Sequence, residues 1–258
     1  MSKLKEIYLY REMIISLVRR ELRGRYKGSV LGFLWTFVNP LLQLGVYTIV
    51  FSNIIRMGID KYYLFLFVAL IPWIFFSSCL TSGSSCILNQ KDMVKKIYFP
   101  REVLPIAHVT TNFVNMLLCF IVIFSVLIVS KVDINIKAIL YLPIIMIVEY
   151  ILSLGIAMLS SAVTVFFRDL EHILGIIGMA WMYLTPVMYS IDLVPNNYLV
   201  LFNLNPMTPI IIAYRDILYY AKTPKLETLF HAFALGIVIL IIGLVVFQKL
   251  QRHFAEEL

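Results

Sequence analysis

The chain has 258 residues, of which 61% are hydrophobic and only 14% are charged. This composition excludes an ordinary soluble domain and predicts an all-α integral membrane protein. The net charge of +7 does not indicate nucleic-acid binding, because most basic residues flank apolar segments, where anionic membrane lipid is the simpler partner. We expect no cleavable signal peptide, since the first apolar segment starts beyond residue 30 and is too long to be one.

Residues 1–30 predict an amphipathic helix that lies in the membrane interface. Its apolar side chains recur at helical spacing on one face, and its charged side chains cover the other. The alternative is an ordinary soluble helix that packs on the core of a domain. The apolar face comprises Leu4, Ile7, Tyr8, Ile14, Ile15, Val18 and Leu22. The basic residues that end the segment are Arg19, Arg20, Arg23, Arg25 and Lys27.

Residues 31–258 predict a transmembrane domain with six spans. About 20 apolar residues cross the hydrocarbon layer, and six segments approach or exceed this length. The predicted spans are Gly32–Ile55, Tyr62–Leu88, Ile106–Val129, Ala138–Phe166, Ile173–Tyr189 and Phe230–Phe247. An even number of spans places both termini on one side of the membrane. Most Lys and Arg residues fall on that side, so we expect both termini to be cytoplasmic.

The stretch between the fifth and sixth spans lies outside by this topology, yet much of it is apolar. Tyr198–Leu204 and Met207–Tyr220 are each too short to cross a membrane, and prolines interrupt the stretch. Residues 195–225 therefore predict a re-entrant hairpin of two short helices that dips part-way into the bilayer. Arg215 and Asp216 would then lie near the outer exit.

Three glycines mark the junction between the N-terminal helix and the first span. Gly24, Gly28 and Gly32 are spaced by four, which permits close contact between two helices. The same glycines also allow the chain to bend from a flat helix into an upright one. We favour the bend.

Few polar side chains fall inside the predicted spans, and Glu149 is a carboxylate near mid-depth. A carboxylate there costs several kcal/mol unless it is paired or faces water. By depth alone, Asn115 or Asn112 can reach it. A structural hydrogen bond and a channel-facing group both remain open, whereas a proton relay is disfavoured because no second membrane acid accompanies Glu149.

Five segments carry a shared pattern that extends over nearly the whole chain. They are RELRGRYKGSVLGFLWTFVNPLLQL (20–44), FPREVLP (99–105), FRDL (167–170), TPVMYS (185–190) and LNPMTPIIIAYRDIL (204–218). Together they resemble the permease subunits of type-2 ABC exporters, in the branch that exports polysaccharides such as O-antigen and teichoic acid. The resemblance implies a bacterial inner-membrane homodimer that binds two copies of an ABC ATPase. It also implies a polyprenyl-pyrophosphate-linked glycan as the transported substrate.

The resemblance further assigns roles to particular residues. The loop 89–105 resembles the family's coupling helix, which contacts the ATPase, and the turn after the fourth span offers a second contact. The coupling residues are then Lys91, Asp92, Lys95, Lys96, Phe99, Pro100, Arg101, Glu102, Arg168 and Asp169. The basic end of the N-terminal helix would form a gate for the lipid pyrophosphate head. Without the resemblance, the loop is an ordinary basic loop on the cytoplasmic side.

Aromatic side chains are candidates for lining the sugar path. Sugar C–H faces stack on aromatic rings, and a conduit must bind its cargo weakly enough to release it. The candidates are Phe33, Phe37, Tyr47, Phe51, Trp181 and Tyr183. The first four share one helical face, together with Pro40 and Leu44. For any one of them, packing between helices is the stronger interpretation.

The chain lacks the sequence patterns of an enzyme. It has no P-loop pattern, no metal-ligand spacing of His, Cys, Asp or Glu, and no recognisable nucleophile–base arrangement. We therefore predict no catalytic residue, no metal site and no cofactor, with ATP bound by a separate partner subunit. Two alternatives remain: a type-2 ABC exporter of a drug or small lipid, and an integral membrane enzyme that acts on polyprenyl-linked sugars.

Overall fold

The structure, a computed structural model, describes residues 3–24, 28–133 and 135–258. Within these ranges the fold is all-α, without a strand, as the sequence predicts. The helices are α1 (Lys3–Leu9), α2 (Arg11–Gly24), α3 (Trp35–Thr48), α4 (Tyr62–Ser84), α5 (Lys91–Lys96), α6 (Val103–Val129), α7 (Ile136–Ile139), α8 (Leu142–Phe166), α9 (Leu170–Tyr183), α10 (Leu199–Leu204), α11 (Met207–Leu218), α12 (Leu226–Leu250) and α13 (Phe254–Glu257).

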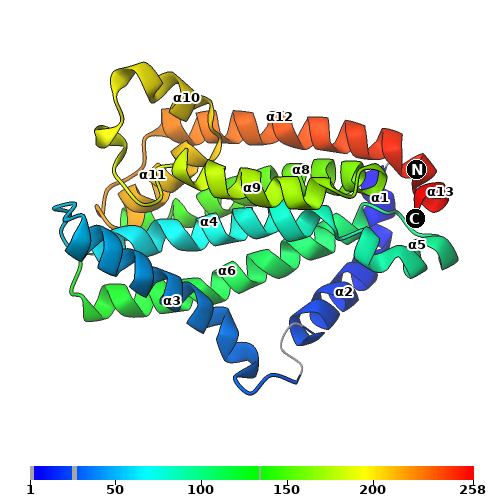
Figure 1. Cartoon of the computed structure of the whole chain (residues 1–258), viewed down its shortest axis with the longest axis horizontal. Coiled ribbons are helices and arrows are strands. Elements are labelled where there is room, and N and C mark those ends of the chain that lie inside the picture. The colour runs from blue at the N-terminus through cyan, green and yellow to red at the C-terminus, as the bar shows by residue number, and fades with distance from the viewer. Residues whose placement is uncertain (1–2, 25–27, 134) are drawn as a thin grey trace.

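The bundle is built around α4. This helix packs against α3, α6, α8, α9 and α11, and its apolar side chains are buried almost all the way round. A helix that is apolar on every side is stable only when other helices surround it. Helices α4, α6, α8 and α12 run along the long axis of the molecule, whereas α3 leans away from them (Figure 1).

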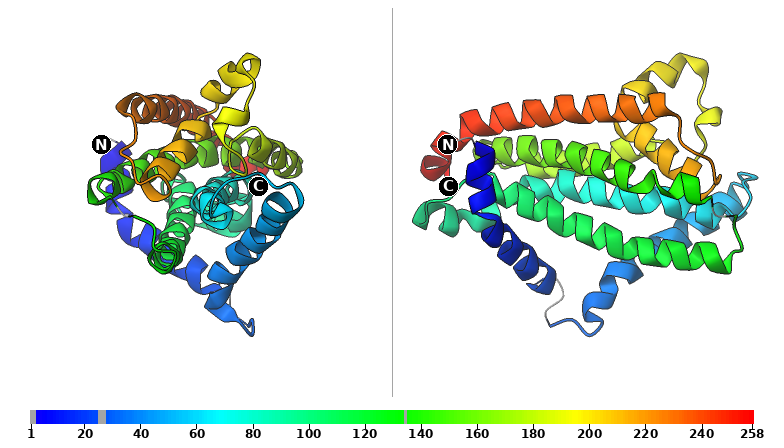
Figure 2. Two further views of the ribbon diagram at one scale, coloured as in Figure 1. Left: turned by 90° about the vertical axis from the view of Figure 1, so that its left-hand side faces the viewer. Right: turned by 180° about the vertical axis from the view of Figure 1, so that it is seen from behind.

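The two chain termini lie at the same end of the bundle. Helix α5 and the turn between α8 and α9 lie at this end as well, and α10 lies at the opposite end (Figures 1 and 2). The predicted coupling loop and both termini therefore share one side of the molecule.

Five helical stretches in the described ranges are long and apolar enough to cross a membrane, and the protein is a multi-pass membrane protein. They are Gly32–Ile54, Tyr62–Ser84, Val103–Val129, Ile136–Phe166 and Leu226–His253.

The predicted fifth span, Ile173–Tyr189, differs from these five because its helix is too short to cross the membrane. Its helix α9 has 14 residues and ends at Tyr183, which gives a length of about 21 Å. The hydrocarbon layer is about 30 Å thick. Pro186 lies in the turn that follows, where a proline cannot continue a helix.

The glycines between α2 and α3 bend the chain. Gly28 and Gly32 have φ values of +85° and +48°, which side-chain-bearing residues rarely adopt. No atom of another segment lies within 4 Å of the position that a Cβ would take at Gly24, Gly28 or Gly32. The structure therefore supports the bend, and not a close helix contact, at these three positions.

Close helix contact occurs instead between α8 and α12. A Cβ on Gly155 would lie 2.6 Å from the backbone of Leu240, and a Cβ on Gly243 would collide with the carbonyl oxygen of Gly155. Only residues without a side chain allow two helix backbones to approach this closely. The two glycines thus fix the distance between α8 and α12.

The region 195–225 forms two short helices, close to the bounds that the sequence predicts. Ten of the twelve residues of α11 are buried, and α11 packs against α4, α8 and α12. Helix α10 is mostly exposed and buries only Phe202. Helix α11 is therefore part of the core of the bundle.

Candidate functional site

Helix α2 packs along α6 at the end of the bundle that carries the termini. Its side chains Met13, Ile14 and Leu17 contact a small apolar cluster of the core. Tyr8 on α1 and Ile15 on α2, which the sequence places on the apolar face, are exposed. The position of α6 determines which side chains of α2 contact the bundle, so these side chains are not the same set as the predicted apolar face. The predicted position of the helix in the membrane interface stays a prediction.

Three of the five predicted gate residues are exposed on α2, namely Arg19, Arg20 and Arg23. Arg20 donates a hydrogen bond to the side-chain oxygen of Gln90 over 2.8 Å. The other two, Arg25 and Lys27, lie outside the described residues. The described part of the predicted gate is therefore a row of accessible cations beside the start of α5.

A chain of hydrogen bonds joins α2 to α4 and α6. His108 Nδ1 lies 2.9 Å from a carboxylate oxygen of Glu21. On the other side of the ring, Asn112 donates to His108 Nε2 over 3.0 Å, and the Ser82 hydroxyl lies 3.2 Å away. Arg20, Glu21 and His108 line a cavity of about 340 Å³. Among the described residues, no three His, Cys, Asp or Glu side chains gather as a metal site requires.

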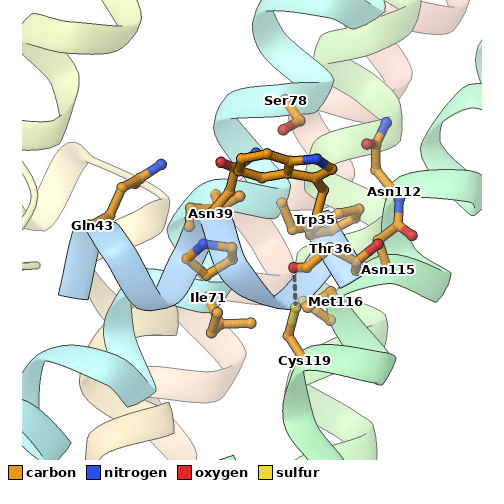
Figure 3. Close-up of a pocket in the computed structure, with 13 residues that line it drawn as sticks. Trp35, Thr36, Asn39, Gln43, Ile71, Ser78, Asn112, Asn115, Met116 and Cys119 are labelled. Carbon is orange, nitrogen blue, oxygen red and sulfur yellow. Dashed lines mark hydrogen bonds between the residues drawn. The ribbon is translucent and has the colours of Figure 1, made fainter. Parts of the chain in front are cut away.

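A second cavity, which we call the α3 cavity, has a volume of about 220 Å³ and lies between α3, α4 and α6 (Figure 3). It is lined by Trp35, Thr36, Asn39, Pro40, Gln43, Ile71, Ile74, Phe75, Ser78, Asn112, Asn115, Met116 and Cys119. None of these side chains is charged, and many carry an amide or hydroxyl group. Asn115 is buried, and neither of its amide atoms has a hydrogen-bond partner among the described residues.

Most residues of the α3 cavity are not among the site residues predicted from the sequence. Asn39 and Gln43 lie four residues apart in the first apolar segment, a spacing that puts both amides on one helical face. This spacing is the one signal in the sequence that points to the cavity. Ser78, Asn112 and Asn115 come from α4 and α6, and no sequence spacing connects them with α3.

Glu149 is fully buried, and its partner is not the predicted one. The Tyr214 hydroxyl donates a hydrogen bond to Glu149 Oε2 over 2.6 Å. Asn115 lines the α3 cavity, so the predicted pairing of Glu149 with Asn115 or Asn112 is wrong. The reason is that α11 inserts into the bundle and brings Tyr214 to α8. The geometry agrees with a structural hydrogen bond.

Arg215 is also buried, with 3% of its surface exposed, and does not lie at an open exit. Its guanidinium group donates hydrogen bonds to the carbonyl oxygens of Pro186, Val187 and Tyr189 at 2.5 to 3.0 Å. It also lies 3.6 Å from the ring centroid of Phe65. Three carbonyl oxygens in the turn after α9 and one aromatic ring thus stabilise one buried cation. Arg215 is therefore inaccessible from outside in this structure, because α11 packs inside the bundle.

The exposed residues of the predicted coupling loop lie on α5. Lys91, Asp92, Lys95 and Lys96 are exposed, while Val94 is 4% exposed and anchors the helix to the core. The helix ends before Pro100, as the sequence predicts. The loop therefore presents a charged, accessible surface at the end of the bundle that carries the termini.

Other predicted coupling residues hold the loop to the bundle. Phe99 and Glu102 are buried, and Gln251 donates a hydrogen bond to Glu102 over 3.1 Å. Arg101 donates to the carbonyl oxygen of Gln251, and its guanidinium group lies 5.7 Å from the ring centroid of Phe254. Burial lowers the pKa of Arg101 from its ordinary value. Phe99 and Glu102 are thus inaccessible to a partner protein in this structure.

The rest of the predicted coupling set is more accessible. Pro100 is half-buried, and Arg168 and Asp169 are exposed in the turn between α8 and α9. This turn lies at the same end of the bundle as α5 (Figure 1). The structure therefore brings both predicted ATPase contacts to one face.

The four aromatic candidates of the first predicted span, of which Phe37 and Tyr47 lie on α3, divide into two environments. Phe33 is 47% exposed, and its ring makes an edge-to-face contact with Phe37 at 5.6 Å. Phe37, Tyr47 and Phe51 are half-buried and pack against the core of the same chain. Phe51 stacks on Tyr62 at the start of α4, with ring centroids 6.2 Å apart. Three of the four rings therefore pack between helices of this chain.

The two aromatic candidates on α9 also differ. Trp181 is half-buried: its Nε1 donates to Asn205 over 2.9 Å, and its ring lies 5.1 Å from that of Phe76. Tyr183 is 60% exposed at the end of α9. Among the six aromatic candidates, the exposed side chains are thus Phe33, which precedes α3, and Tyr183, which ends α9.

Comparison with known proteins identifies the family. Residues 12–219 match the family model described as ABC-2 type transporter. The chain is 34% identical over 256 residues to the O-antigen export system permease protein RfbA of Myxococcus xanthus, covering 98% of both chains. It is 32% identical over 251 residues to RfbA of Klebsiella pneumoniae, covering 97% of this chain and 96% of that one. These matches confirm the resemblance found in the sequence, and the chain belongs to the ABC-2 type transporter family of membrane proteins.

Proposed function

We propose that the chain is the membrane permease subunit of an ATP-driven exporter. Its cargo would be a lipid-linked polysaccharide, of the O-antigen or teichoic-acid type, carried from the cytoplasm across the bacterial inner membrane. The observation that carries this proposal is the end-to-end similarity to permeases that are named for O-antigen export. Those relatives are named as transport proteins, which favours transport over the alternative of a membrane enzyme.

The proposed working unit is a homodimer. Only 11% of the most apolar stretch of the first span, Gly32–Ile54, is buried within the chain. Helix α9 buries only Leu174 and Gly178. A second copy would cover α3 and α9, and the surface between the two copies would form the path for the glycan. On this proposal, α9 and the turn after it complete a sixth crossing, and the hairpin of α10 and α11 closes the outer end.

Energy would come from two copies of a separate ABC ATPase at the end of the bundle that carries α5. The chain has no P-loop pattern of its own. The exposed charges of α5, together with Arg168 and Asp169, are the surface available to such a partner. The basic residues of α2 lie at the same end, where they would attract the pyrophosphate head of the cargo as it enters.

Reversing two charges on α5 tests the function and the coupling surface together. In the native host, a Lys95→Glu and Lys96→Glu double variant should lose surface glycan, and lipid-linked glycan should accumulate inside the cell. The ATPase should also fail to co-purify. The two lysines are expected to pair with acidic groups of the partner, and the introduced carboxylates would repel those groups. The matched control, Lys137→Glu with Lys225→Glu, changes two exposed lysines on the loops at the opposite end.

The outcomes separate the candidate functions. Normal assembly and normal surface glycan in the α5 variant would remove α5 from the coupling surface. Loss of glycan synthesis in a strain without the chain, in place of internal accumulation, would support the membrane enzyme. Unchanged surface glycan in that strain would support export of a drug or small lipid.

A further inference from the structure

We propose that the α3 cavity binds a single sugar ring of the exported glycan within each protomer. This inference rests on the proposed function and adds a site to it, apart from the surface between two copies. Its residues come from three helices of one chain, α3, α4 and α6, and Figure 3 draws their side chains.

The first argument is the chemistry of the buried amide at Asn115. Its side chain is 91% buried, yet both amide atoms lack a hydrogen-bond partner among the described residues. Burying an amide without a partner costs about 1 to 3 kcal/mol, so such a group indicates an occupant that supplies the missing bonds. An amide donates and accepts at once, and a sugar hydroxyl does the same.

The second argument is what the lining excludes. No Lys, Arg or His lines the cavity, so the pyrophosphate of the lipid anchor would find no cation there. An acyl chain would leave the buried amide of Asn115 without a ligand to bond. A neutral, hydroxyl-rich ring can satisfy this amide, and its C–H faces can stack on the aromatic rings of Trp35 and Phe75, which also line the cavity. Trp35 is held in place, since its Nε1 donates to Ser29 over 3.0 Å.

The third argument is size and access. A volume of about 220 Å³ lies below the range of about 300 to 1,000 Å³ that is usual for drug-sized ligands, which limits the occupant to about one ring. Asn39 and Gln43 are exposed at the mouth, and Asn115 lies at the buried end. Gln43 and Ser78 also line an adjoining cavity that reaches Gly178 on α9. The α3 cavity thus opens beside the proposed glycan path.

Binding of simple glycosides tests the site. The probes are the methyl glycosides of glucose, galactose, mannose and N-acetylglucosamine, added to the permease–ATPase complex in lipid nanodiscs. Saturation-transfer NMR should show binding of at least one of them. Asn115→Leu should weaken that binding about tenfold, the effect of losing one or two hydrogen bonds. The matched control Asn53→Leu changes an exposed asparagine outside the cavity, so binding should not change.

A second variant guards against misfolding. Gln43→Leu alters the exposed mouth and should also weaken binding, while the melting temperature stays that of the wild type. Equal binding by the wild type and both cavity variants, or no binding of any glycoside by the wild type, would overturn the inference. If the wild type still exports its glycan in that case, the proposed function survives and only the site is lost.

Discussion

Two neighbouring residues of α11 bring polar groups into the interior of the bundle. Tyr214 donates to the carboxylate of Glu149, and Arg215 donates to the carbonyl oxygens of Pro186, Val187 and Tyr189. In each case the partner is provided by a segment far away in the chain. Hydrogen bonds offset the cost of burying polar groups, so these two residues help to fix where α11 lies against α8 and the turn after α9.

Substitutions at Glu149 distinguish a structural bond from a transport role. Glu149→Gln keeps an acceptor for the Tyr214 hydroxyl and should retain both stability and export. Glu149→Leu leaves that hydroxyl buried without its partner, which should cost about 1 to 3 kcal/mol. The melting temperature of the purified protein and the level of surface glycan check the two variants.

A different result would restore the channel-facing interpretation of Glu149. If Glu149→Gln folds normally but loses export, the carboxylate acts beyond its bond to Tyr214. The substitution Tyr214→Phe is the complementary control, because it removes the donor and keeps the ring.

At the scale of the elements, contact between helices depends on a few positions. Gly155 and Gly243 allow α8 and α12 to meet backbone to backbone. Gly28 and Gly32 instead allow a turn between α2 and α3. Glycine thus acts in two ways in one chain, and its spacing does not show which way applies.

Adding one methyl group at the contact between α8 and α12 should destabilise the protein. Gly243→Ala places a Cβ against the carbonyl oxygen of Gly155, so the helices must separate, at a cost of about 1 to 3 kcal/mol. Gly24→Ala on α2 is the matched control, since no atom lies within 4 Å of its Cβ position and alanine is the better helix former. Thermal unfolding in detergent should show a lower melting temperature for Gly243→Ala alone. Equal melting temperatures would mean that the contact is not close.

At the scale of the whole molecule, one end of the bundle carries α5, the turn after α8 and both termini, and the other end carries α10 (Figure 1). One hydrogen bond, between His108 and Asn112, connects the cavity beneath α2 with the α3 cavity.

Labelling of introduced cysteines checks the orientation of the two ends. Cys79, Cys86 and Cys119 are all buried, so they should react little with a membrane-impermeant maleimide. In intact spheroplasts, Asn196→Cys should be labelled, because the loop before α10 is expected outside. Lys95→Cys on α5 should react only after the membrane is opened. Labelling of Lys95→Cys in sealed spheroplasts would contradict the predicted orientation.

Much of the proposed coupling surface was predictable because it depends on short segments. The exposed lysines of α5 lie between two apolar segments, and a break before Pro100 is visible in the sequence. The buried positions of Phe99 and Glu102 were not, since they follow from the approach of the C-terminal segment with Gln251. The local sequence pattern predicts where the loop lies, and the packing of distant segments determines which of its residues remain accessible.

The sequence by itself determined the class of protein, the helices and the family. Apolar segments of spanning length must be helical, because lipid offers no partner for backbone polar groups. Tertiary structure alone decided that Glu149 meets Tyr214, that Arg215 is internal, and that Asn115 faces a cavity. Hydropathy and periodicity describe neighbours along the chain, whereas these contacts join helices that lie far apart in sequence and meet only when the bundle packs.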